Sequence, residues 1–97
     1  WVQVDGTWYL LSASGAMLTG WQMIDGRWYY FDADGWMMTG WISQNGSWYY
    51  LNSNGVMQTG WLNLNGSWYY LDPTSGVMAS DTWVDGCYLD HSGVWKR

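Results

Sequence analysis

One short block recurs along the chain, and this repeat limits the possible folds more than any other sequence feature. Gly-Trp pairs return every 20 residues, at Gly20-Trp21, Gly40-Trp41 and Gly60-Trp61. A unit of this length is too short to bury its own apolar face, so neighbouring units must cover one another. The period therefore predicts a solenoid, in which stacked repeats share one continuous core.

Each repeat contains two apolar and aromatic runs around Asp-Gly or Asn-Gly, as at Asp25-Gly26. These dipeptides favour the type I′ turn of a two-residue β-hairpin, because both central residues need a positive φ. Such a turn fixes the register and places Trp21 opposite Tyr30. Side chains alternate between the faces of a strand, so Tyr29 and Tyr30 point to opposite sides. We assign to packing the tyrosine that directly follows the second tryptophan of each repeat, namely Tyr9, Tyr29, Tyr49 and Tyr69.

The repeats are expected near residues 1–20, 21–40, 41–60 and 61–81, with a degenerate terminal repeat at 82–97. A polar connector follows each hairpin and ends on a glycine such as Gly35, which we expect in the left-handed conformation. The whole chain, 1–97, is interpreted as one module. Because it opens on Trp1 in the middle of a repeat, we interpret it as the C-terminal piece of a longer protein.

The last repeat departs from the pattern. Thr82 replaces the expected tryptophan, and a shortened hairpin places Trp83 opposite Tyr88. Terminal repeats of solenoids are usually atypical because they cover an open end. We therefore expect Val94 and Trp95 to fold back over the last hairpin.

Aromatic residues make up 21% of the chain, with 11 Trp and 8 Tyr, so rings must supply most of the packing and of the exposed chemistry. The net charge is −5, and only three residues are basic, which excludes a nucleic-acid surface or an anionic-membrane surface. No apolar run approaches the roughly 20 residues of a membrane helix, so membrane insertion is not expected.

Few residues of the chain could serve as catalytic groups or as metal ligands. His91 is the only histidine and lacks a second catalytic candidate, and Cys87 is the only cysteine. A disulfide framework and a cysteine zinc site are therefore excluded. Asp32 and Asp34 lack the further ligands of a calcium loop. We predict a module with no active site, no metal and no cofactor; a hydrolase domain of the parent protein would lie upstream.

The aromatic rings suggest a cation site. Rings such as Trp28 from one hairpin, with Trp41 and Tyr50 from the next, would attract a quaternary ammonium ion. Three rings contribute roughly 2–6 kcal/mol, which brackets the roughly 4 kcal/mol of a millimolar site. The same rings could simply pack the hairpins, and Met37 and Met57 could line a cage or fill gaps. The residues alone leave both interpretations open.

The succession Gly-Trp, Gly-x-Trp-Tyr-Tyr and Gly-x-Met-x-Thr-Gly-Trp resembles the choline-binding repeats of Gram-positive surface proteins, autolysins and phage lysins. The resemblance covers nearly the whole chain, including the degenerate stretch 78–86. It implies an all-β, left-handed β-solenoid of about five stacked hairpins, secreted and held at the cell wall. It also implies that the partner is choline or phosphocholine carried by cell-wall teichoic or lipoteichoic acid, and that it binds between consecutive hairpins.

The resemblance also implies the site residues. Each site would combine two tryptophans and a tyrosine of neighbouring repeats: Trp8, Trp21 and Tyr30; Trp28, Trp41 and Tyr50; Trp48, Trp61 and Tyr70. Met37 and Met57 would line them. Trp68 lacks its partner because Thr82 stands there, and Trp83 and Tyr88 are the candidate replacements.

Two alternatives to choline binding remain. Glucan-binding repeats share the hairpin, but sugars need hydrogen-bonding side chains around the stacked ring. The residues near the tryptophans are Met, Thr, Gly and Ser, which favours choline. The other alternative is a structural, self-associating repeat, for which the terminal hairpins are a candidate homodimer contact.

Overall fold

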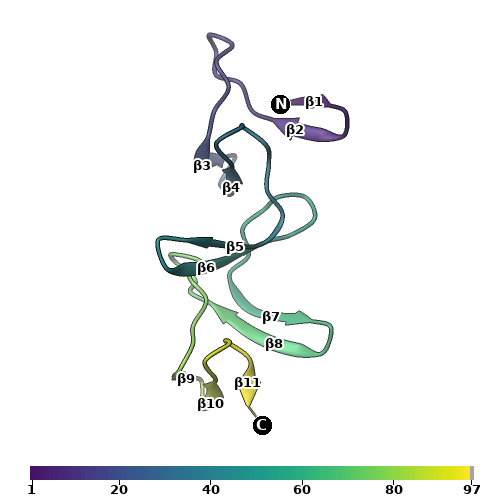
Figure 1. Ribbon diagram of the computed structural model, residues 1–97. Helices are drawn as coiled ribbons and strands as arrows, with labels where there is room; N and C mark the ends of the chain where they lie inside the picture. The colour runs from purple at the N-terminus through teal and green to yellow at the C-terminus, as the bar shows by residue number, and fades with distance from the viewer. Residues whose placement is uncertain (97) are drawn as a thin grey trace. The chain divides into compact units, whose positions relative to one another are not determined.

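The computed structural model describes residues 1–96, and within this range every regular element is a β-strand (Figure 1). Strands pair into successive hairpins: β1 (Val2–Val4) with β2 (Thr7–Tyr9), β3 (Gly20–Ile24) with β4 (Arg27–Phe31), β5 (Gly40–Gln44) with β6 (Ser47–Leu51), and β7 (Gly60–Leu64) with β8 (Ser67–Leu71). The last sheet has three strands, β9 (Thr82–Val84), β10 (Cys87–Leu89) and β11 (Trp95–Lys96), in the order β11-β10-β9. The all-β hairpin fold expected from the sequence is confirmed.

The chain divides into two compact units. The first contains residues 1–40 and 51–57, and the second contains residues 41–50 and those from Gln58 onward. Each unit holds hairpins together with the connectors that pack on them. The left-handed winding of the whole array stays a prediction.

The hairpin turns have the geometry expected of Asp-Gly and Asn-Gly. Asp25 has a φ of 52° and Gly26 a φ of 80°, as a type I′ turn requires. The register is also confirmed, because Trp21 lies opposite Tyr30. The same holds in the shortened last hairpin, where Trp83 lies opposite Tyr88.

The core contains one fully buried side chain in each repeat after the first, together with Ile42, which is 8% exposed. Phe31, Leu51, Leu71 and Leu89 are each 0% exposed, and each ends the second strand of its hairpin. Leu11 follows the first hairpin at the equivalent position, yet it is 39% exposed. A repeat thus buries its central side chain only where neighbouring structure covers it, as expected of a stacked array.

Backbone hydrogen bonds connect successive repeats. In each case, the N–H of a connector methionine donates to the carbonyl of a tryptophan in the hairpin of the preceding repeat. The pairs are Met37 with Trp8 at 2.9 Å, Met57 with Trp28 at 2.9 Å and Met78 with Trp48 at 2.8 Å. The bond holds the methionine backbone beside the tryptophan of the preceding repeat.

The connector glycine is required for two separate reasons. Gly55 has a φ of 84°, in the left-handed region that other residues avoid. A β-carbon at Gly55 would also lie 2.5 Å from the Sδ atom of Met37. Gly93 has the same relation to Met78, again at 2.5 Å. The methionine of one repeat thus packs against the glycine of the next.

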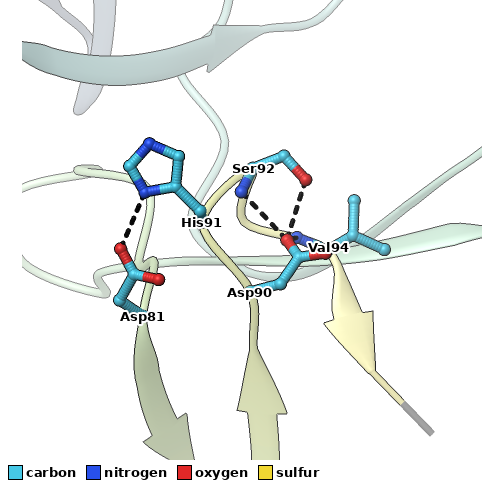
Figure 2. Close-up of polar contacts among 5 residues, drawn as sticks. All are labelled: Asp81, Asp90, His91, Ser92 and Val94. Atoms are coloured by element: carbon cyan, nitrogen blue, oxygen red, sulfur yellow. Dashed lines mark hydrogen bonds and ion pairs between the residues drawn. The ribbon is translucent and has the colours of Figure 1, made fainter.

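The C-terminal tail folds back as expected, since β11 pairs with β10 and Trp95 lies opposite Leu89. The Asp90 carboxylate stabilises the intervening turn (Figure 2). It accepts the Ser92 hydroxyl at 2.8 Å and the N–H groups of Ser92 and Val94 at 2.9 and 3.0 Å. These bonds, the Ser92 hydroxyl first, hold the pKa of Asp90 below its ordinary value.

Replacing a core leucine tests whether burial follows the stacking of repeats. We expect Leu71→Ala to lower the free energy of unfolding by about 2–5 kcal/mol, because it leaves a cavity in a fully enclosed site. Leu11→Ala, at the equivalent exposed position, should cost clearly less. Urea denaturation of both variants measures the difference, and equal losses would contradict a core built one residue per repeat.

Replacing a connector glycine separates backbone strain from crowding. Gly15 has a φ of 87° but open space around it, so Gly15→Ala adds only strain of about 1–2 kcal/mol. Gly55→Ala adds similar strain and also displaces the Met37 side chain. Methyl NMR should therefore show a moved Met37 signal in Gly55→Ala alone. An unmoved signal would show that the two residues are not in contact.

Candidate functional site

Each hairpin presents different aromatic residues on its two faces. In the β7–β8 hairpin, Trp68 lies opposite Asn63, which is two residues from Trp61 along the strand. Side chains two apart share a face, so the two tryptophans point to the same side. Tyr70 lies opposite Trp61 on that side, and Tyr69 points to the reverse side. The hairpin thus carries a pair of indoles on one face and its first tyrosine on the other.

The indole pair has the same geometry in three hairpins. The ring centroids are 6.2 Å apart at an angle of 83° for Trp1 and Trp8, 6.3 Å and 87° for Trp21 and Trp28, and 6.5 Å and 82° for Trp41 and Trp48. Two nearly perpendicular rings form a corner. Trp8, Trp28 and Trp48 are exposed side chains, so the corner opens toward solvent.

In the first unit, such a corner forms part of the wall of an open pocket of about 430 Å³. Its lining residues are Trp1, Trp8, Tyr29, Met37, Ser53 and Asn54. The ring of Tyr29, from the next hairpin, lies 4.9 Å from that of Trp1 at 69°. Met37 is held beside Trp8 by the hydrogen bond between their backbones. Three rings and a thioether therefore surround the cavity, and polar groups come from Ser53 and Asn54.

The second unit repeats this arrangement. The second pocket is lined by Trp41, Gly46, Trp48, Tyr69, Met78, Ser80, His91 and Ser92. The Tyr69 ring lies 5.0 Å from Trp41 at 64°, and the Met78 N–H donates to the Trp48 carbonyl. The same four repeat positions thus supply the Trp-Trp-Tyr-Met set in both pockets.

This set differs from the grouping expected from the sequence. Trp21 and Tyr30 were expected beside Trp8, but neither lines the pocket that contains Trp8. The register explains the difference: Tyr30 faces Trp21 of its own hairpin, with ring centroids 5.1 Å apart. Tyr29, assigned above to packing, points from the reverse face and reaches the preceding hairpin's tryptophans. The alternation that separates the two tyrosines was visible in the sequence.

Three other expected site residues, Trp28, Tyr50 and Tyr70, each contact a tryptophan of their own hairpin. Trp28 pairs with Trp21 in the first unit, and Met57 is hydrogen-bonded to the Trp28 backbone. Tyr50 lies 5.1 Å from Trp41, and Tyr70 lies 5.1 Å from Trp61, each within its own hairpin. Trp61 does not line the pocket of Trp48.

The residues expected to complete a site at Trp68 lie elsewhere. Trp83 is 68% exposed and its ring contacts that of Tyr88 at 5.2 Å. Neither lines the cavity at Trp68, which is formed by Trp61, Trp68, Cys87 and Trp95. The register is the reason, because Trp83 and Tyr88 hold the positions of Trp61 and Tyr70. The residues at these positions in the second hairpin, Trp21 and Tyr30, likewise do not line the preceding pocket. Sequence reasoning missed these aromatic and sulfur-containing lining residues: Trp1, Tyr29, Tyr69, Met78, Cys87 and Trp95.

A titratable pair borders the second pocket. His91 Nδ1 lies 2.9 Å from Asp81 Oδ2 (Figure 2), and the histidine side chain is 96% exposed. The hydrogen bond with Asp81, together with the charge of that carboxylate, raises the pKa of His91 above its ordinary value. His91 thus lies at the surface, as expected, and changes charge beside an aromatic cavity.

The pockets offer ring faces and sulfur atoms, which suit a large, weakly hydrated cation. Among residues 1–96, no group of three or more His, Cys, Asp or Glu side chains is arranged to hold a metal ion. In the same range, no helix is long and apolar enough to cross a membrane.

Comparison with known proteins agrees with this geometry. A family model described as a choline-binding repeat matches residues 1–39, 18–53 and 38–83. Choline binding protein F of Streptococcus pneumoniae, solved in the presence of a peptidoglycan analogue, is 45% identical with a TM-score of 0.96. That match covers 100% of this chain and 33% of the other.

Two further solved structures are similar. The choline binding domain of Spr1274 in Streptococcus pneumoniae is 48% identical with a TM-score of 0.77, over 82% of this chain and 96% of that domain. The endolysin of phage Cp-1 complexed with choline is 31% identical with a TM-score of 0.68, over 99% of this chain and 30% of the endolysin.

The chain spans about a third of the length of choline binding protein F. A comparison with curated proteins finds no match. The family model nevertheless covers most of the sequence, and the relatives share its hairpins along nearly the whole length. The chain belongs to the choline-binding repeat family.

Proposed function

We propose that this chain is a non-catalytic module that binds choline groups of cell-wall teichoic or lipoteichoic acid and so holds a larger, secreted protein at the cell surface. The observation that carries the proposal is the recurrence of one pocket in two units, built each time from two tryptophans, a tyrosine and a methionine. Packing alone would fill the corner between the indoles. Here the corner stays hollow and open.

The ligand's trimethylammonium group enters between the rings. Its positive charge is attracted to the electron-rich ring faces, and it has no N–H group whose hydration must be replaced. Each ring contributes about 0.5–2 kcal/mol, so one pocket reaches roughly millimolar affinity. Met37 and Met78 complete the wall with a polarizable sulfur.

The second tyrosine of each pair has a supporting role in this proposal. Tyr30, Tyr50 and Tyr70 lie edge-on to the first tryptophan of their own hairpins, at centroid distances of 5.1 Å and angles between 63° and 67°. Edge-to-face contacts of this kind are favourable. They hold the indole in the orientation that forms the corner.

Repetition converts weak sites into a firm attachment. A teichoic acid carries many choline groups, so binding at one pocket raises the effective concentration of ligand at the next. The gain in avidity reaches about 10²–10⁴ when the geometry permits simultaneous binding. Anchoring then follows from the number of pockets, and soluble choline at high concentration would release the module.

Removing one tryptophan tests the second pocket. We expect choline to shift the methyl NMR signals of both Met37 and Met78 in the unchanged protein. Trp48→Ala removes one ring worth about 0.5–2 kcal/mol, so the Met78 response should need roughly 2–30 times more choline. The Met37 response should stay as before.

Trp83→Ala is the matched control, since Trp83 is an exposed tryptophan of the same unit that lines neither pocket. It should change neither response. The proposal fails if choline moves neither methionine signal in the unchanged protein, or if dextran oligosaccharides move them instead. The latter outcome would identify a glucan-binding module.

The second pocket should also depend on pH. Below its raised pKa, His91 becomes an imidazolium and adds positive charge at the rim of a cation site, which the Asp81 carboxylate offsets only in part. Asp90, the other nearby acid, is engaged by Lys96 at 3.8 Å. Choline affinity at Met78 should therefore fall, relative to that at Met37, as the pH decreases from about 8 to about 5. His91→Gln should remove the difference. Parallel pH profiles at the two methionines in the unchanged protein would show that His91 does not affect the pocket.

A further inference from the structure

A third cavity lies in the second unit. It has a volume of about 300 Å³ and is lined by Trp61, Trp68, Cys87 and Trp95. Trp61 and Trp68 come from one face of the β7–β8 hairpin, as the tryptophan pairs of the other pockets do. Cys87 and Trp95 come from β10 and β11. Neither of these two residue types occurs at the corresponding places in the other pockets.

The register shows which positions these residues occupy. Leu89 ends β10 fully buried, as Leu71 ends β8. Tyr88, one residue earlier, lies opposite Trp83, as Tyr70 lies opposite Trp61. Counting back one more residue, Cys87 therefore occupies the position of Tyr69. The cysteine stands where the other pockets have their tyrosine.

The same comparison places Trp95. It lies opposite Leu89, as Met78 bridges to Leu71. The preceding turn is closed in the same way, since the Asp90 N–H donates to the Val94 carbonyl at 2.9 Å and the equivalent bond at Asp72 is also 2.9 Å. Trp95 therefore occupies the methionine position. Relative to the other pockets, the third ring and the sulfur atom have exchanged places.

We propose that this cavity is an additional quaternary-ammonium site, in which Trp61, Trp68 and Trp95 supply the rings and Cys87 supplies the sulfur wall. The inference rests on the proposed function. Tryptophan is the best cation–π partner among the aromatic side chains, so three indoles compensate for the missing phenol. The Trp61 and Trp95 centroids are 6.4 Å apart at 58°, too tilted for stacking, and the space between the walls is hollow.

The ligand class follows from the lining. The Cys87 thiol is the only hydrogen-bonding group besides the indole N–H groups, and its Sγ lies 3.8 Å from the Asp85 carbonyl. The cavity is also smaller than the first pocket, at about 300 against about 430 Å³. It should therefore take a compact alkylammonium head and discriminate against a primary ammonium, which is strongly hydrated.

Cys87 provides a specific measurement, because it is the only cysteine of the chain. We would measure the rate of its alkylation by iodoacetamide with choline chloride, with ethanolamine hydrochloride and with sodium chloride at equal ionic strength. Choline at about ten times its dissociation constant should slow alkylation roughly tenfold by occupying the cavity. Ethanolamine and sodium chloride should leave the rate unchanged.

Trp95→Leu keeps an apolar side chain at the methionine position but removes a ring, so protection of Cys87 should be lost or strongly reduced. Trp68→Leu should act in the same way from the opposite wall. Trp83→Ala, outside the cavity, should keep full protection. The choline responses of Met37 and Met78 in each variant show that the fold and the other pockets are intact.

Choline that fails to protect Cys87 while Met37 and Met78 still respond would overturn this inference and leave the proposed function standing. Equal protection in Trp95→Leu, Trp68→Leu and the unchanged protein would also overturn it, since the shielding would then come from elsewhere. Absence of all three responses would instead refute choline binding by the module as a whole.

Discussion

The alternation of side chains across a two-residue hairpin is the constraint on which the rest of the structure depends. The Asp-Gly or Asn-Gly turn fixes the register, and the register fixes the face on which each ring lies. Two tryptophans share one face of the hairpin because they are diagonal neighbours, and the first tyrosine points to the opposite face. The rings of a pocket then come from the front of one hairpin and the back of the next. The connectors add the methionine and, in the first pocket, Ser53 and Asn54.

The contacts that join repeats also shape the pockets. The methionine N–H that donates to a tryptophan carbonyl connects one repeat to the preceding one, and the same methionine lines the cavity beside that tryptophan. The connector glycine leaves room for the methionine of the repeat before it. Since the core of residues 1–96 is small, with Phe31, Leu51, Leu71 and Leu89 fully buried, these contacts contribute to stability as well as to recognition. Stability and ligand geometry are therefore coupled at Met37 and Met78.

The last repeat differs from the others in sequence and in hairpin length, yet a cavity still forms where it meets the β7–β8 hairpin. Its hairpin is shorter, and Trp83 holds the position of the leading tryptophan opposite Tyr88. This exposed ring lines neither the second pocket nor the cavity at Trp68. A buried leucine and an aspartate-stabilised turn nevertheless keep the backbone positions of the other repeats. Cys87 and Trp95 thereby stand at the tyrosine and methionine positions. The conserved feature is the position relative to Leu89, and the residue type at that position can differ.

The sequence by itself determined the hairpins, their turns, their register and the aromatic character of the sites, because these depend on local turn chemistry and on a period of two along a strand. It also indicated the family. The grouping of rings across hairpins needed the tertiary structure, since residues of different repeats meet only after stacking, and a repeat count does not say which face meets which. For that reason Tyr30 was expected beside Trp8, where Tyr29 lies, and Trp83 and Tyr88 were expected beside Trp68, where Cys87 and Trp95 lie. Only the packed structure showed Trp1 as a pocket wall and Cys87 in the place of a tyrosine.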